Sequence, residues 1–175
     1  SDLDHGAHRA IEDQRAVREQ VGQGLRPGIS QRLHEGTHFA VTIRPMKNLL
    51  PRQAWEWLQQ QDDPLFIDVR MEIESMYVGR PPGVEHVAWY EYPDLTPDPD
   101  RFVDSVEHLA GRKDRAVLLI CRSGVRTVAA GEALEAAGFS NVAHVVHGFE
   151  GDLDAHFKRS SLNGWRFEGL PWEQM

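Results

Sequence analysis

The feature that most constrains the fold is an uninterrupted apolar segment in the second half of the chain. Residues 115–121 read RAVLLIC, with no charged side chain from Ala116 to Cys121. Such a run is typical of a strand that is buried on both faces of a parallel sheet. The polar loop CRSGVR follows, and residues 125–138 are rich in helix formers up to Gly138. We therefore expect a strand, a tight loop and a helix in direct succession.

The chain from residue 39 onward repeats this alternation of strands and helices. Further strands are predicted at residues 39–43, 65–69, 83–89 and 142–146. Further helices are predicted at residues 51–61, 71–79, 101–111 and 149–159, with Asp98 or Asp100 as the cap of the third. The pattern predicts an α/β domain with a five-stranded, mainly parallel sheet and helices on both faces.

The two ends of the chain are predicted to lie outside this domain, which spans residues 39–159. Residues 1–38 form an N-terminal arm, partly helical or flexible, because Gly and Pro interrupt a charged, helix-forming stretch. Residues 160–175 form a C-terminal extension, and we expect its aromatic side chains, Trp165, Phe167 and Trp172, to pack it onto the domain.

The composition limits the partners and the location of the protein. A net charge of -8 argues against a nucleic-acid partner. No segment has the length and apolarity that a bilayer span requires, so we expect no membrane association. The one cysteine cannot form an internal disulfide, which fits a reducing compartment. We expect a cytoplasmic location, or a periplasmic one if a leader was removed.

Cys121 lies where ligands bind in such folds, at the carboxyl end of a strand and before a helix. The peptide N–H groups of residues 122–126 can turn toward its sulfur and, with the helix dipole, form an anion site. Arg122 and Arg126 add positive charge, and Gly124 permits a tight turn. Each feature favours the thiolate over the thiol. The alternative is a cysteine that merely ends a buried strand, but it leaves the glycine and the arginines unexplained.

Four segments resemble the rhodanese (thiosulfate sulfurtransferase) family, and they occur in that family's order. CRSGVRT at residues 121–127 is similar to its active-site loop, and LFIDVR at 65–70 to its Asp-Val-Arg motif. VGRPPGVEHVAW and VVHGFEG are similar to the segments that follow in family members. Three residues depart from the pattern: Arg80 stands where His is usual, His147 replaces a glycine, and Asp152 stands where tryptophan is common.

The resemblance implies a sulfurtransferase in which Cys121 becomes a persulfide. The donor would be a small anionic sulfur compound such as thiosulfate, and the acceptor cyanide or a thiol, including a thiol of a protein. The family's functional positions would correspond to a catalytic Cys121 and to a substrate-binding loop of Arg122, Ser123, Gly124, Val125 and Arg126. Asp68 and Arg70 would support the loop or contact substrate; a structural ion pair is the alternative. The resemblance implies no cofactor and no metal.

Two other functions are compatible with the same fold. Related phosphatases and arsenate reductases carry one residue more between cysteine and arginine than the four found here, which makes a ring wide enough for a tetrahedral oxyanion. Non-catalytic domains of this fold bind partners, usually without the cysteine. Since this chain keeps Cys121 in a short loop, sulfur transfer is the leading interpretation.

Histidine patterns elsewhere in the chain do not indicate a metal site. HEGTH at residues 34–38 matches a zinc motif that works only on a helix, whereas Gly36 and the following FAVTI predict a loop that leads into a strand. His144 and His147 fall in a predicted strand and its exit turn, where exposed or hydrogen-bonded side chains are expected. Trp89, Tyr90 and Tyr92 follow a strand and either line an acceptor pocket or anchor a loop.

Overall fold

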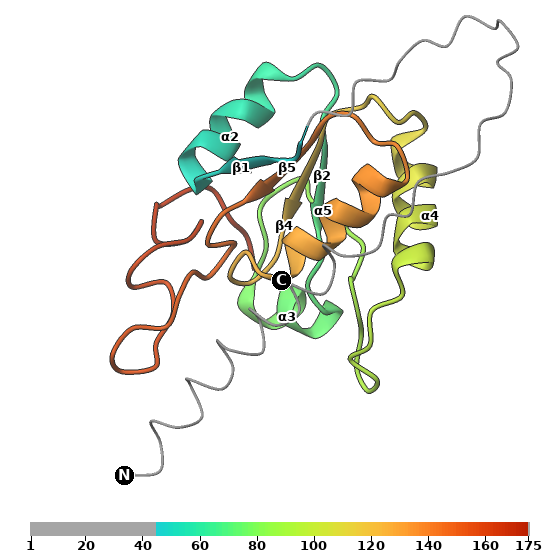
Figure 1. The fold of residues 1–175 in the computed structure, drawn as a ribbon. Coiled ribbons are helices and arrows are strands. Elements are labelled where there is room, and N and C mark those ends of the chain that lie inside the picture. The colour runs from blue at the N-terminus through green and yellow to red at the C-terminus, as the bar shows by residue number, and fades with distance from the viewer. Residues whose placement is uncertain (1–44, 175) are drawn as a thin grey trace, which may run out of the picture. The chain divides into compact units, whose positions relative to one another are not determined.

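The computed structural model describes residues 45–174, which are built around a five-stranded sheet (Figure 1). The strands are β1 (Lys47–Leu49), β2 (Leu65–Asp68), β3 (Glu85–His86), β4 (Val117–Ile120) and β5 (Val142–Val145). They lie in the order β1-β5-β4-β2-β3, and every neighbouring pair is parallel. The predicted α/β class and the parallel sheet are therefore confirmed.

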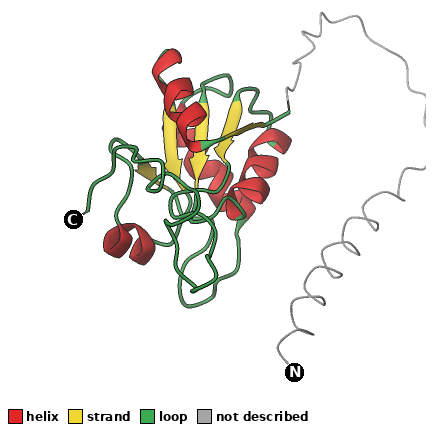
Figure 2. Cartoon of the chain, turned by 90° about the vertical axis from the view of Figure 1, so that its left-hand side faces the viewer, coloured by secondary structure: helices red, strands yellow, loops and turns green. Residues whose placement is uncertain are grey.

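Helices cover both faces of this sheet, as the views in Figures 1 and 2 show. They are α2 (Pro51–Gln60), α3 (Glu72–Val78), α4 (Pro99–Ala110) and α5 (Arg126–Ala136). Successive side chains of β4 point to opposite faces, so the strand contributes to two core layers. Leu119 packs with apolar side chains of α4 and α5, whereas Leu118 packs with those of α2. Because β4 is buried on both faces, all of its side chains are apolar, and it therefore appears in the sequence as one long apolar run.

The predicted helix ends follow local chemistry. Pro51 occupies the first turn of α2, where its missing N–H costs no hydrogen bond. Of the two cap candidates, Asp98 caps α4, since its carboxylate accepts the N–H of Arg101 at 3.0 Å. Gly79 ends α3 and Gly138 follows α5, both with positive φ.

The helix predicted over residues 149–159 is wrong. These residues form an irregular segment of turns. The N–H groups of Phe149 and Glu150 donate to carbonyls of the Cys121 loop rather than to a helix. Farther along, the Asp154 carboxylate accepts two backbone N–H groups, of His156 and Lys158, and so replaces helical hydrogen bonds with side-chain ones.

The two edge strands of the sheet differ from the predicted strands. Only Glu85 and His86 of the predicted strand 83–89 pair with β2. The strand predicted at 39–43, the arm at 1–38 and the HEGTH motif lie outside the described residues. The edge strand β1, Lys47–Leu49, was not predicted, because it is short and shows no clear apolar alternation.

The segment after β5 is anchored by one aromatic side chain. Trp165 is fully buried, contacts Phe66 and Trp55, and donates its indole N–H to the carbonyl of Pro171 at 2.8 Å. Phe167 and Trp172 remain about half exposed. Of the three aromatic residues expected to pack the extension, Trp165 therefore buries the most surface.

Candidate active site

The Cys121 thiol lies directly beyond the end of β4, at the base of the loop that leads into α5. Its residue is 1% exposed, and the Gly124 N–H donates to Sγ at 3.1 Å. Gly124 has φ +86°, and a Cβ there would approach the His147 backbone nitrogen to 2.9 Å, so glycine is required. The prediction named the amides of residues 122–126. In the part of the chain that the structure describes, the amide that reaches the sulfur is that of Gly124.

The other loop residues differ in their access to solvent. Arg122 and Val125 are exposed, whereas Ser123 is partly buried and Arg126 begins α5. The loop carbonyls are held from below, because the Phe149 N–H donates to Cys121 at 2.8 Å and the Glu150 N–H to Arg122 at 2.9 Å. The loop is thus fixed between α5 and the turn that follows β5.

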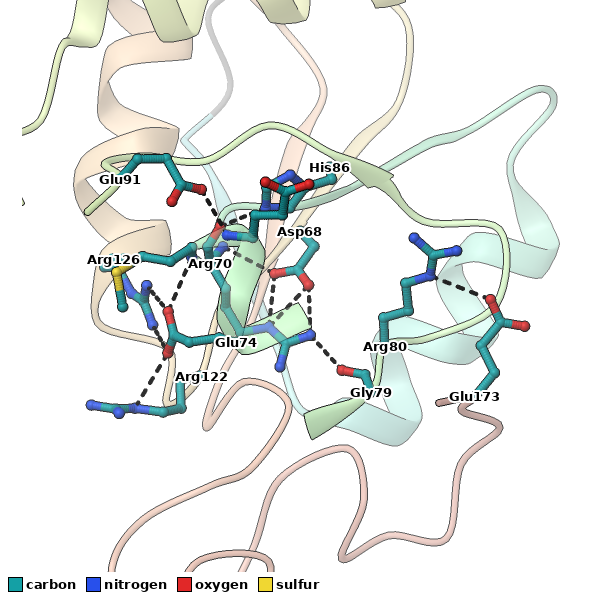
Figure 3. A network of polar contacts seen from close by, with 12 residues as sticks. Asp68, Arg70, Glu74, Gly79, Arg80, His86, Glu91, Arg122, Arg126 and Glu173 are labelled. Carbon is teal, nitrogen blue, oxygen red and sulfur yellow. Dashed lines mark hydrogen bonds and ion pairs between the residues drawn. The ribbon is translucent and has the colours of Figure 1, made fainter. Parts of the chain in front are cut away.

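A carboxylate that sequence reasoning missed joins the two arginines of the loop. Glu74 of α3 binds Arg126 through two hydrogen bonds of 2.6 and 2.8 Å, and its Oε1 lies 3.9 Å from Nε of Arg122 (Figure 3). The paired side chains of Glu74 and Arg126 are 10% and 11% exposed, whereas that of Arg122 is 46% exposed. Arg122 is therefore the more accessible cation of the loop.

The Glu74–Arg126 pair remains ionised despite its burial. Burial would raise the pKa of the Glu74 carboxyl, but the hydrogen bond and the charge of Arg126 outweigh this effect and lower the pKa. Burial would likewise lower the pKa of Arg126, and Glu74 raises it above its ordinary value. Of the two arginines predicted beside Cys121, one, Arg126, thus has its charge balanced by Glu74.

Asp68 and Arg70 form a fully buried ion pair behind the loop. Nη2 of Arg70 lies 2.6 Å from Oδ2 of Asp68 and also donates to the Gly79 carbonyl at 2.7 Å (Figure 3). The guanidinium lies 4.5 Å from the centre of the Phe149 ring. Of the alternatives left open by the sequence, this geometry favours a structural pair, which ties β2, the end of α3 and the turn after β5 together.

The three departures from the rhodanese pattern are engaged in contacts within the chain. Arg80 exchanges two backbone hydrogen bonds of 2.8 Å with Glu173 and pairs with its carboxylate at 3.3 Å. His147 lies 3.3 Å from the Asp152 carboxylate, so these two departures pair with each other. None of the three side chains contacts the sulfur, whose hydrogen-bond partners within residues 45–174 are Gly124 and Thr127.

A cleft of about 740 Å³ lies between α4 and the segment after β3. Trp89 and Tyr90 line it, whereas Tyr92 is outside it and 78% exposed. The Tyr90 ring also lies 5.2 Å from the Arg126 guanidinium, so one side chain contacts both the cleft and the arginine of the loop.

His144 is buried and uses both ring nitrogens. It is 5% exposed; Nδ1 lies 2.9 Å from the Thr127 hydroxyl and Nε2 lies 2.7 Å from Oδ1 of Asn48. Burial lowers the pKa of His144, so the ring is neutral near pH 7. The sequence predicted either an exposed or a hydrogen-bonded His144 side chain, and the structure shows a buried, hydrogen-bonded one.

This burial predicts a pH-dependent loss of stability. Below about pH 6.5 the unfolded chain binds a proton at His144 before the folded chain does. The free energy of unfolding should therefore fall as the pH drops from about 7 to about 5, by at most about 1.4 kcal/mol per pH unit for this group. Urea unfolding of wild type and His144→Gln measures the difference. If the free energy of unfolding falls equally with pH in the two proteins, the prediction is contradicted.

Residues 45–174 contain neither a cluster of metal ligands nor a membrane-spanning helix. No group of three or more His, Cys, Asp or Glu side chains in that range could hold a metal ion. No helix in the same range has the length and apolarity to cross a membrane.

Comparison with known proteins identifies the class that this fold and loop define. The family model for the Rhodanese-like domain matches residues 50–155, and the chain belongs to that family. The crystal structure of Rv0390 from M. tuberculosis is 38% identical, with a TM-score of 0.64, over 74% of this chain and 98% of that one.

Two curated relatives extend the comparison. The thiosulfate sulfurtransferase GlpE of Glaesserella parasuis is 29% identical over 59% of this chain and 82% of its own length. An uncharacterized protein of Rickettsia conorii is 27% identical over 73% of this chain and 98% of its own length. The family model and the sulfurtransferase relative associate the chain with donors and acceptors of sulfur in general.

Proposed function

We propose that this chain is a sulfurtransferase that carries sulfane sulfur as a persulfide on Cys121. The observation that carries the proposal is the hydrogen bond of 3.1 Å from the Gly124 amide to Sγ, at a strand end where Arg122 is exposed. A fixed amide donor of this kind stabilises negative charge on sulfur. The name of the Glaesserella parasuis relative, a thiosulfate sulfurtransferase, supports the same chemistry.

The proposed reaction has two displacement steps. The Cys121 thiolate attacks the outer sulfur of thiosulfate, the sulfur–sulfur bond of thiosulfate breaks, and sulfite leaves with the bonding electrons. A nucleophile such as cyanide then attacks the outer sulfur of the persulfide and returns the bonding electrons to Sγ as a thiolate. Since the chain has one cysteine, no second thiol of the same chain can discharge the persulfide, so the acceptor is external.

The donor would bind at Arg122, and Glu74 would limit how much anionic charge the loop accepts. Arg122 retains an exposed guanidinium, whereas Arg126 is paired with Glu74. We assign donor binding to residues 122–126 and a supporting role to the Asp68–Arg70 pair. The cleft beside Tyr90 would receive the acceptor, which can be a small thiol, cyanide or a thiol on a protein.

Glu74→Gln should lower the KM for thiosulfate about fivefold, because it removes a negative charge worth roughly 1 kcal/mol beside the dianionic donor. Steady-state thiocyanate formation at varied thiosulfate measures this. Glu132→Gln, which changes an exposed carboxylate on α5 outside the cleft, is the matched control and should leave KM unchanged. An unchanged or raised KM in Glu74→Gln would show that Glu74 does not limit donor binding.

We also propose the boundaries and the location of the protein. Residues 39–159 would form the catalytic domain, and residues 160–175 an extension packed on it through Trp165, which is fully buried. Residues 1–38 would form a separate arm. The single cysteine fits a reducing compartment, and we propose the cytoplasm.

The direct test is an assay of the purified full chain. Incubation with thiosulfate and cyanide should yield thiocyanate in a catalytic, saturable reaction. An aryl phosphate, and arsenate with a thiol reductant, serve as competing substrates for the alternative functions of the fold. Turnover of either one without any thiocyanate formation would contradict sulfur transfer.

A further inference from the structure

A chain of hydrogen bonds leads from the buried thiol to the exposed edge of the sheet. Sγ of Cys121 lies 3.9 Å from the hydroxyl of Thr127, which is fully buried on α5. The hydroxyl meets Nδ1 of His144 at 2.9 Å, and Nε2 meets Oδ1 of Asn48 at 2.7 Å. Asn48 is exposed on β1, an edge strand. The four residues come from β1, β5, the residue directly after β4 and α5, and they form one continuous polar path through an apolar core.

The Thr127 hydroxyl is the branch point of this path. It has one proton and three acceptors within reach: the Gly124 carbonyl at 3.0 Å, Nδ1 of His144, and Sγ once it is ionised. A hydroxyl that accepts a hydrogen bond from a ring N–H becomes a better donor in turn. The tautomer of His144 therefore decides whether the hydroxyl donates to the ring. When Nδ1 carries the proton, the hydroxyl proton is left for the Gly124 carbonyl or for the ionised sulfur, and the charged sulfur attracts it more strongly than a neutral carbonyl does.

We propose that Thr127 and His144 conduct the Cys121 proton to the sheet edge and direct the Thr127 hydroxyl at the ionised sulfur. This inference rests on the proposed use of Cys121 as a nucleophile. His144 acts through Thr127 and is a positioning residue. It needs no positive charge, which agrees with a buried ring that is neutral near pH 7.

The proton balance is complete without any other reactant than water. In the thiol state, S–H donates to Oγ1 of Thr127, Oγ1–H donates to Nδ1, and Nε2–H donates to Asn48. On ionisation the sulfur proton passes to Oγ1, the hydroxyl proton passes to Nδ1, and the Nε2 proton leaves to water beside Asn48. The S–H electron pair stays on sulfur. Asn48, being exposed, can turn its amide so that its N–H then donates to Nε2.

Other ionisable side chains lie around this path. Those near the thiol are Arg122 and Arg126, Glu74 of α3, Asp68 of β2 with Arg70 just after it, Tyr90, and His147 in the turn after β5. Lys47, next to Asn48, donates to Asn141 and faces Trp57. Because none of them is altered by changes at Thr127 or His144, the contribution of the path can be measured separately.

The test is the pH profile of Cys121 alkylation by iodoacetamide in the full chain, since only the thiolate reacts. Thr127→Val and His144→Leu should each move the midpoint of the profile upward by about one pH unit, the effect of losing a hydrogen bond to a charged group. Thr127→Ser keeps the hydroxyl and should retain the wild-type midpoint. Ser161→Ala removes an exposed hydroxyl that donates to the Asp154 carboxylate, lies outside the cleft, and is the control that should keep the wild-type midpoint.

Unchanged midpoints in folded Thr127→Val and His144→Leu would overturn the proposal, since a purely structural role would change thermal stability alone. Should the buried variants fail to fold, Asn48→Leu provides the test. It should shift the midpoint in the same direction by less than one unit, and a wild-type midpoint would contradict the path. An ordinary thiol midpoint in the wild type would count against the proposed function, while the differences between variants would still decide this inference.

Discussion

Cys121→Ser should lower the rate of thiocyanate formation from thiosulfate and cyanide by at least about a thousandfold. The hydroxyl of serine is far less acidic than a thiol and cannot hold sulfur as a persulfide, so the first displacement step has no nucleophile. The Gly124 amide, Arg122 and the rest of the loop stay in place, because the two side chains differ by one atom. The measurement is steady-state kinetics on the purified variant.

Two controls make the Cys121→Ser result decisive. Circular dichroism and thermal unfolding should show the wild-type fold, since the residue is small and buried. Wild-type protein alkylated with iodoacetamide should lose activity to the same degree. Retained activity in either preparation would mean that sulfur transfer does not pass through this residue.

Arg70→Leu should lower the free energy of unfolding by about 3–5 kcal/mol, because it leaves the Asp68 carboxylate buried without its partner. That is a large part of the roughly 5–15 kcal/mol by which a domain of this size is stable. The variant should also lose activity, since Arg70 joins β2 to Gly79 and Phe149 behind the loop. Urea unfolding of the variant and the wild type measures the loss.

The double variant Asp68→Leu/Arg70→Leu separates the charge from the packing. It removes both charges together and should be more stable than Arg70→Leu alone, because no carboxylate is left unpaired. Arg80→Leu, which breaks a partly exposed pair with Glu173, should cost less than about 1 kcal/mol. Equal losses in Arg70→Leu and Arg80→Leu would mean that the buried pair contributes no more than a surface one.

Much of the fold was predictable because its signals are local. The apolar run before Cys121 identifies β4, and capping by Asp98, Gly79 and Gly138 marks where helices begin or end. The helix predicted after β5 failed for a reason that is not local. The amides of Phe149 and Glu150 bind carbonyls of a loop nearly thirty residues earlier, and no sequence pattern records that competition.

The sequence predicts only those residues of the candidate site that are consecutive in the chain. The loop from Cys121 to Arg126 is contiguous, so its residues could be named from spacing. Glu74 reaches Arg126 from α3, across 52 residues, and a carboxylate in the first turn of a helix is too common to indicate a site by itself. His144 was visible as a histidine in a strand, but its contact with Thr127 depends on how α5 packs on β5.

The central claim is that Cys121 carries a sulfur atom, and intact-protein mass spectrometry tests it most directly. Incubation with thiosulfate should add about 32 Da to the wild-type chain, cyanide should remove it, and Cys121→Ser should show no gain. A folded wild-type protein without any added mass, or an equal gain in Cys121→Ser, would contradict the account.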